Sequence, residues 1–199
     1  MNRGRGHLLR YTWNRFKWHY FPRWGIVSRF PEHVDIELSS ACDMKCPMCY
    51  TTTDAFKKLV PKKLLDMELF KKIIDEIAGK VYAVRLSLRG EALLHKNFVD
   101  CVAYAKKAGI KEVSTLTNGA KLKGKSLERI LESGIDWITI SIDGTGETYE
   151  KIRKPIKFKQ IVANLTEIRD YKIKRGIVKP VIKVQGIWPA VRENPELYY

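Results

Sequence analysis

The chain has 199 residues, of which 45% are hydrophobic, and this is enough apolar material for one sizeable core domain. Its net charge is +15, and no apolar run reaches the length of about 18 residues that a membrane-spanning helix needs. The amino terminus also lacks the apolar segment and the small-residue cleavage site of a secretory signal. The composition therefore predicts a basic cytoplasmic protein with no transmembrane segment.

Residues 1–32 are expected to form a basic, aromatic arm in front of a core domain that spans residues 33–199. The first thirty residues hold seven Lys and Arg, eight aromatic residues and no acidic residue. Such a segment can bind RNA by base stacking and phosphate contacts. It can equally lie on an anionic membrane surface. A simpler alternative is that its aromatic side chains pack on the core domain while its arginines stay solvated.

From residue 33 onward, strand-like and helix-like segments alternate. Runs rich in β-branched and aromatic residues predict strands at 34–39, 81–88, 111–117, 136–142 and 180–187. Between them, apolar residues recur at helical spacing, as in Phe70, Ile73, Ile74 and Ile77. Each helical segment ends at a glycine, a residue that readily takes the left-handed conformation of a helix end. These glycines are Gly79, Gly109, Gly134 and Gly176.

This alternation predicts βαβ units and therefore an α/β fold with a parallel sheet covered by helices. In parallel β/α folds the chemistry gathers at the carboxyl ends of the strands. Polar motifs follow four of the predicted strands: SSACDMKCPMC, RGE (89–91), TNG (117–119) and SIDG (141–144). We expect all four motifs at one rim of the sheet. No sixth strand follows residue 187, so a barrel of this kind would be incomplete, and we expect a truncated chain.

Three of the four cysteines, Cys42, Cys46 and Cys49, lie within eight positions. Such a cluster is a poor disulfide framework, and in a reducing compartment it more often binds a metal. A structural zinc ion would need a fourth ligand. The candidates for that ligand are His33, His95 and Cys101, although Cys101 falls on an apolar helix stripe and fits a small buried hydrophobe better. A [4Fe–4S] cluster on three thiolates would instead leave one iron open to a substrate or cofactor.

The spacing Cys42-x3-Cys46-x2-Cys49 after a first strand resembles the signature of the radical S-adenosylmethionine (radical SAM) superfamily. A Gly-Gly-Glu-like motif follows the second strand in that family, and Arg89-Gly90-Glu91 is similar to it, with an arginine that would crowd the site or reach a carboxylate. The runs CPMCY and SIDG followed by ETYEKIR resemble members with a cysteine-rich, SPASM-type extension at the carboxyl terminus. The resemblance implies a partial (β/α)6 barrel that lacks at least its last strand.

The resemblance also implies the cofactors and the residues that bind them. The three cysteines would ligate three irons of a [4Fe–4S] cluster, and S-adenosylmethionine would chelate the fourth. Reductive cleavage would give a 5′-deoxyadenosyl radical that takes a hydrogen atom from the substrate. Glu91 would accept from the ammonium of the methionine moiety, Gly90 would allow close backbone approach, and Met48 would contact adenine. The strand-end residues Asn118, Ser141 and Asp143 would bind ribose hydroxyls or the carboxylate, although turn formation beside a glycine also explains Asn118 and Asp143.

The leading functional expectation is a radical SAM enzyme that acts on a peptide or a small metabolite, with a flavodoxin- or ferredoxin-like reducing partner. Two alternatives stay open. The basic arm would suit an RNA-modifying radical SAM enzyme. The absence of a predicted sixth strand would suit a non-catalytic, truncated fragment that binds an iron–sulfur cluster or zinc.

Overall fold

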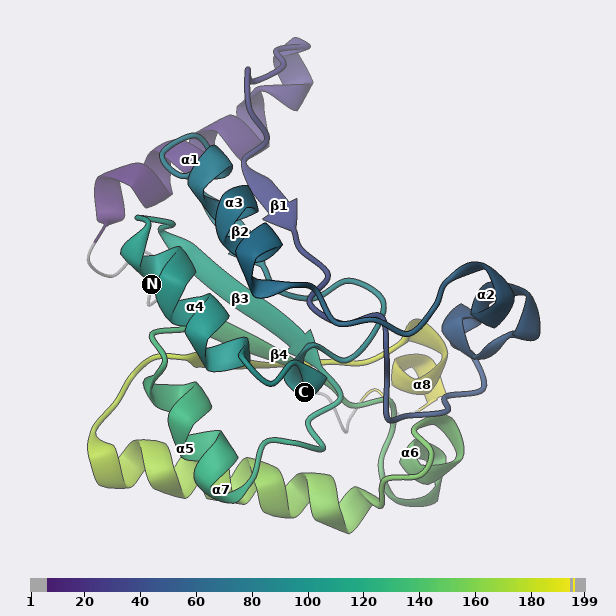
Figure 1. Cartoon of the computed structure of the whole chain (residues 1–199). Coiled ribbons are helices and arrows are strands. Elements are labelled where there is room, and N and C mark those ends of the chain that lie inside the picture. Colours follow the sequence, from purple (N-terminus) through teal and green to yellow (C-terminus); the bar gives the residue numbers. More distant parts are fainter. Residues whose placement is uncertain (1–6, 194, 196–199) are drawn as a thin grey trace.

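The computed structural model, which describes residues 7–193 and 195, contains a five-stranded parallel sheet (Figure 1). The strands lie in the order of the sequence: β1 (His33–Asp35), β2 (Ala83–Arg85), β3 (Glu112–Thr117), β4 (Trp137–Ser141) and β5 (Val181–Gln185). All four neighbouring pairs are parallel. Sequential order with helical connections is the topology of a partial β/α barrel, so the predicted fold class is confirmed.

The connecting helices cover one face of this sheet, as Figure 1 shows. They are α3 (Met67–Ile77), α4 (Phe98–Lys107), α5 (Gly124–Glu132) and α7 (Phe158–Arg175). Asp66 caps α3 by accepting from the backbone N–H groups of its first turn, and Phe70 and Ile74 on the inner face of α3 are completely buried. The four glycines predicted to end helical segments all have positive φ, between +63° and +94°. The helical periodicity and its end signals were therefore interpreted correctly.

Short elements and loops gather at the end of the sheet where the strands finish. Helices α2 (Asp54–Leu59), α6 (Gly146–Ile152) and α8 (Trp188–Glu193) lie there, together with the 3-10 turns η3 (Tyr50–Thr52) and η4 (Ala92–Leu94). Helix α1 (Leu8–Tyr20) and the following turn η2 (Pro22–Trp24) lie at the opposite end in Figure 1. No helix among the described residues combines the length and the apolar character needed to cross a membrane.

All five strands are shorter than the sequence predicts, and β2 differs most. β1 ends at Asp35 rather than at residue 39, and β2 covers 83–85 rather than 81–88. Ile36 and Leu38 remain buried, at 5% and 0% exposure, while the backbone after β1 leaves the sheet for the cysteine loop. Ser39 then forms an isolated antiparallel bridge with Leu64. The apolar run therefore marks burial correctly but overestimates the length of the strand.

Candidate cluster and cofactor site

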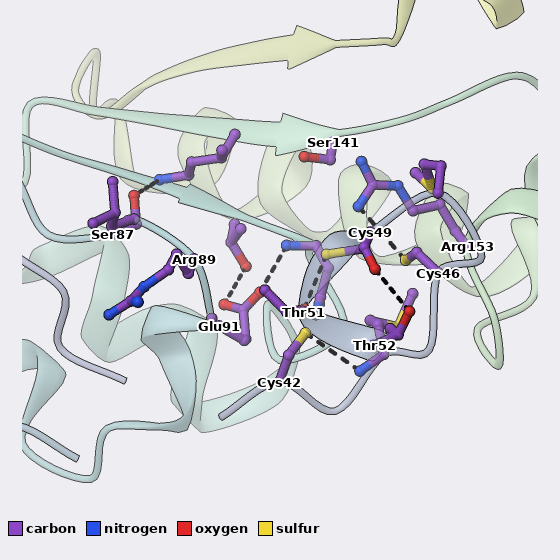
Figure 2. Close-up of a pocket in the computed structure, with 17 residues that line it drawn as sticks. Cys42, Cys46, Cys49, Thr51, Thr52, Ser87, Arg89, Glu91, Ser141 and Arg153 are labelled. Atoms are coloured by element: carbon purple, nitrogen blue, oxygen red, sulfur yellow. Dashed lines mark hydrogen bonds between the residues drawn. The ribbon is translucent and has the colours of Figure 1, made fainter. Parts of the chain in front are cut away.

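A pocket of about 240 Å³ lies where β2, β3 and β4 end (Figure 2). It collects most of the residues predicted for the site from segments more than 90 positions apart in the sequence. Those that line it are Cys42, Cys46, Met48, Cys49, Gly90, Glu91, Asn118 and Ser141. The expectation that the four strand-end motifs meet at one rim is therefore met for these residues.

Each of the three thiols in the pocket has a hydrogen-bonding group beside it. The pairs are the backbone N–H of Met44 with Cys42 Sγ at 3.4 Å, Thr51 Oγ1 with Cys49 Sγ at 3.0 Å, and Arg153 Nη1 with Cys46 Sγ at 3.9 Å. None of the three cysteines forms a disulfide. Donors of this kind stabilise a thiolate, and around an iron–sulfur cluster they set its reduction potential.

Burial raises the pKa of the Cys42 thiol to about 11. It also raises the pKa of Cys46, although the nearby Arg153 acts in the opposite direction. Thiols in such a setting stay protonated until a metal replaces the proton, because metal coordination deprotonates a thiol outright. Cys42 and Cys46 therefore suit metal ligation better than a role as free nucleophiles.

Gly90 fixes the position of the cysteine loop relative to β2. A Cβ atom at this residue would lie 2.2 Å from the carbonyl oxygen of Ser39 and 2.6 Å from that of Ala41. The backbone N–H of Glu91 donates to the same Ala41 carbonyl at 2.8 Å. Only glycine permits this approach, and the contact is with the chain that leads into Cys42.

The Glu91 carboxylate lies at the base of the pocket and is only 3% exposed. It accepts from Thr117 Oγ1 at 2.7 Å, from the backbone N–H of Asn118 at 2.8 Å and from that of Leu93 at 3.1 Å. Burial raises its pKa, while these hydrogen bonds oppose the shift. No ion pair between described residues includes it, so a cationic ligand in the pocket would complete its electrostatic environment.

Arg89 does not crowd the pocket with its guanidinium. Its Nε donates to Glu37 Oε1 at 2.9 Å, and its Nη2 donates to Glu37 Oε2 at 2.5 Å. The guanidinium also lies 5.7 Å from the ring centroid of Phe56. Figure 2 shows the side chain pointing away from the three cysteines. The expectation that Arg89 reaches a carboxylate is confirmed.

Arg153 is the residue of the pocket that the sequence analysis missed. It follows α6, lines the pocket beside Ser141 and Cys46, and donates through Nε to Asp143 Oδ2 at 2.5 Å (Figure 2). Asp143 itself does not line the pocket. It is completely buried, and it also accepts from the backbone N–H of Ile187 at 2.7 Å. The signal for Arg153 was present, since it is the last residue of the ETYEKIR run.

The remaining predicted residues differ in how they meet the pocket. Asn118 accepts from the backbone N–H of Ala120 at 2.8 Å, so it does form the turn beside Gly119, but it also lines the pocket. Its amide donates to Asp43 Oδ1 at 2.8 Å and thereby joins the end of β3 to the cysteine loop. Met48 lines the pocket with 47% of its side chain exposed.

The candidates for a fourth zinc ligand all have other partners. His95 is buried and bonds through Nε2 to the carbonyl of Leu65 at 2.8 Å, His33 lies 2.7 Å from Asp35, and Cys101 is completely buried in α4. Within residues 7–193 and 195, no three His, Cys, Asp or Glu side chains converge on a single-ion site. A cubane cluster binds each thiolate at a different iron and does not need such convergence. Three thiols around one pocket, with a buried carboxylate and a guanidinium beside them, fit such a cluster and an amino-acid ligand on its fourth iron.

Comparison with known proteins identifies one family, described as the "Radical SAM superfamily", which matches residues 36–185. Pre-heme d1 synthase of Dinoroseobacter shibae is 34% identical over 143 residues, which are 70% of this chain and 34% of that protein. The chain spans less than half the length of the curated relatives it matches.

Two solved structures extend this similarity to the fold. Streptococcus suis SuiB bound to precursor peptide SuiA has a TM-score of 0.65 at 15% identity, over 87% of this chain and 36% of that one. The structure titled native anSMEcpe with bound AdoMet has a TM-score of 0.61 at 18% identity, over 78% of this chain and 43% of that one. At these identities the likeness shows a common fold.

Proposed function

The chain belongs to the radical SAM superfamily of enzymes, which use a [4Fe–4S] cluster and S-adenosylmethionine, and from this premise we propose that the pocket at the ends of β2–β4 holds both cofactors. Cys42, Cys46 and Cys49 ligate three irons. The observation that carries this assignment is that three thiols without disulfide partners line one pocket together with Glu91 and Arg153. When bound, the reduced cluster would supply the electron for the reductive cleavage of S-adenosylmethionine, and the cleaved cofactor would take hydrogen from the substrate.

The side chains of the pocket can recognise both charged ends of an amino acid. Glu91 accepts from an ammonium group, because its Oε2 takes only one hydrogen bond among the described contacts and retains acceptor capacity. Arg153 offers a guanidinium to a carboxylate, the pairing for which its planar geometry is best suited. Arg89 is a poorer candidate, because both its Nε and its Nη2 donate to Glu37 and its side chain points away from the three cysteines.

The other lining residues orient the ligand and keep water out. Met48 offers a soft apolar side chain to a purine ring. Ser141 and Asn118 supply polar groups at the ends of β4 and β3 for ribose hydroxyls. Met44, Leu88 and Leu116 complete an apolar lining, which protects a reactive intermediate from solvent. Asp143 acts through Arg153 rather than on the cofactor.

The proposed substrate is a peptide or a small metabolite. Among similar proteins, SuiB is bound to a precursor peptide and pre-heme d1 synthase is named for a small-molecule product. A flavodoxin- or ferredoxin-like protein is the proposed reductant. The alternative of an RNA-modifying enzyme gains no support, because the basic arm lies away from the pocket. The alternative of a zinc-binding fragment gains none either, because the predicted fourth zinc ligands have other partners. The SPASM-type extension stays a prediction.

Anaerobic reconstitution with iron and sulfide tests the assignment. We expect about four irons per chain, and 5′-deoxyadenosine after reduction in the presence of S-adenosylmethionine. Cys46→Ala should lose most of both. The matched control is Cys101→Ala, which removes a buried thiol outside the pocket and should keep both. Equal iron content and equal product in the two variants would show that the cluster is not on these cysteines.

A further inference from the structure

Helix α1 turns its apolar face away from the protein. Leu9, Trp13, Phe16 and Tyr20 recur at intervals of three or four residues and therefore share one face of the helix. All four are exposed, Leu9 at 85% and Trp13 at 56%. Trp24 in η2 extends the row and is also 56% exposed. We refer to Leu9, Trp13, Phe16, Tyr20 and Trp24 as the aromatic ridge.

Polar contacts attach α1 to the domain. Asn14 is buried and donates to Glu32 Oε2 at 2.8 Å, and Lys17 forms an ion pair with the same carboxylate. His7, just before the helix, lies 3.0 Å from the hydroxyl of Tyr82. These contacts hold the helix on the domain while the aromatic ridge stays exposed.

The rim of the aromatic ridge is strongly basic. Arg10, Arg23 and Arg29 are all exposed, and none of them forms an ion pair within the part of the chain that the structure describes. Glu32 is the first acidic residue of the sequence, and Lys17 already pairs with it. A helix with Trp, Phe and Leu on one face and arginines beside it is the pattern of a segment that lies in a bilayer interface.

We propose that α1 and η2 bind the surface of an anionic phospholipid bilayer, with the aromatic ridge inserted among the lipid headgroups and the surrounding arginines contacting lipid phosphates. The helix has 13 residues and lies along the surface rather than across it. Because α1 is at the end of the sheet opposite the pocket, this attachment leaves the pocket facing away from the membrane (Figure 1).

The geometry of the rings favours a membrane over single-stranded RNA. Trp13 stacks on Phe16 with ring centroids 5.5 Å apart and an interplanar angle of 12°, and Tyr20 stacks on Trp24 at 5.3 Å and 26°. In each stacked pair one face of each ring is covered by its neighbour, which reduces the number of ring faces open to bases, and bases bind aromatic residues through those faces. Insertion into the headgroup region needs only the exposed ring edges of the aromatic ridge.

The test is flotation of the full chain with vesicles of phosphatidylcholine alone or mixed with phosphatidylserine. We expect binding to the mixed vesicles only. Trp13→Ser with Phe16→Ser should reduce this binding at least tenfold, whereas the matched change Leu69→Ser, at an exposed apolar residue of α3, should not. Arg10→Gln with Arg23→Gln should reduce it by roughly 25-fold, since each basic group near the surface contributes about fivefold. Lys72→Gln with Lys125→Gln is the control for charge.

Three results would overturn the proposal. Equal binding to both kinds of vesicle would remove the role of the arginines. Absence of vesicle binding together with salt-sensitive RNA binding that the same variants abolish would make the arm an RNA-binding element. Concentration-dependent self-association that Trp13→Ser with Phe16→Ser abolishes, again without vesicle binding, would make the ridge an interface between copies of the chain. Circular dichroism of each variant checks that the fold is kept, and the arginine variants change only exposed side chains.

Discussion

Replacing Arg153 by methionine separates its structural role from its electrostatic role. Its side chain is 16% exposed and that of its partner Asp143 only 1%, so the change leaves a buried carboxylate without its cation. Breaking a buried pair in this way costs about 3–5 kcal/mol. The backbone N–H of Ile187 still donates to Asp143, and we therefore expect the lower end, about 3 kcal/mol.

Urea unfolding of the reduced apoprotein measures this cost. The matched control is Lys151→Met in α6, the helix that Arg153 directly follows, where Lys151 pairs with Glu147 at 76% and 91% exposure and should matter little. Asp143→Asn removes the charge but keeps an acceptor for Ile187. The double variant with Arg153→Met should therefore be more stable than the sum of the two single changes predicts. Strict additivity, or a loss at Arg153→Met below about 1 kcal/mol, would refute the account of this pair.

The reconstituted protein gives a second, independent readout of the same change. Arg153 Nη1 lies 3.9 Å from Cys46 Sγ, where a unit charge interacts by about 4 kcal/mol at an effective dielectric constant near 20. An electron added to the cluster spreads over several atoms, so we expect the reduction potential of Arg153→Met to fall by tens of millivolts, up to about 100 mV. Arg153→Lys keeps the charge and should shift it less. An unchanged potential in Arg153→Met would contradict the proposed proximity of Arg153 to the cluster.

Two further predictions concern the segment around Gly90. Gly90→Ala should lower stability by about 1–3 kcal/mol and reduce iron retention, because the new Cβ atom would lie 2.2 Å from the Ser39 carbonyl oxygen. The control is Gly79→Ala, whose Cβ atom would meet no atom within 4 Å and which should leave the iron content intact. Burial alone would raise the pKa of Glu37, but hydrogen bonds from Arg89 outweigh it and hold the pKa below the ordinary 4.5. Because the pKa of Glu37 is lower in the folded than in the unfolded chain, its ionised form stabilises the fold above pH 4.5. This stabilisation is lost as the pH falls through the pKa of the folded state. Urea unfolding should thus show a deficit of roughly 1 kcal/mol for Glu37→Gln at pH 7 that shrinks on acidification, and a deficit independent of pH would contradict the shift.

The sequence predicted the order and type of the core elements because their signals are local. Helical spacing and a closing glycine both act within one helix, and the buried strands β3 and β4 are rich in β-branched and apolar residues. The carboxyl end of β1 was harder to predict from the sequence. The backbone N–H of Ile36 still donates to the carbonyl of Arg85 at 2.9 Å, but Leu38 stays in the core beyond the last contact with β2, so hydrophobicity continues where strand pairing stops. Strand pairing depends on the neighbouring strands, and the sequence of a single segment does not predict it.

Some residues of the candidate site could be predicted from local sequence signals, and others depend on contacts between distant segments. The three cysteines were found by their spacing, which is a property of one loop. Arg153 is 107 positions from Cys46 in the sequence and has no distinctive spacing to it. Its place in the pocket depends on the return of β4 beside β3 and on the buried Asp143 that orients it. A lone arginine after a helix could be assigned only once the fold had brought these segments together.

The arm shows why amphipathic periodicity alone does not reveal which face of a helix packs on its own domain. The spacing of Leu9, Trp13 and Phe16 is that of an ordinary core-facing helix, and packing of the aromatic residues on the domain was one of the expectations. Turning that face inward would take Asn14 and Lys17 away from Glu32 and would leave the carboxylate without its two strongest partners. Glu32 immediately precedes β1, so the pairing also fixes α1 against the amino-terminal end of the sheet. The outward orientation of the ridge thus follows from the polar contacts of Glu32 rather than from hydrophobicity, and Glu32→Ala should weaken the attachment of α1 without altering the pocket at the other end.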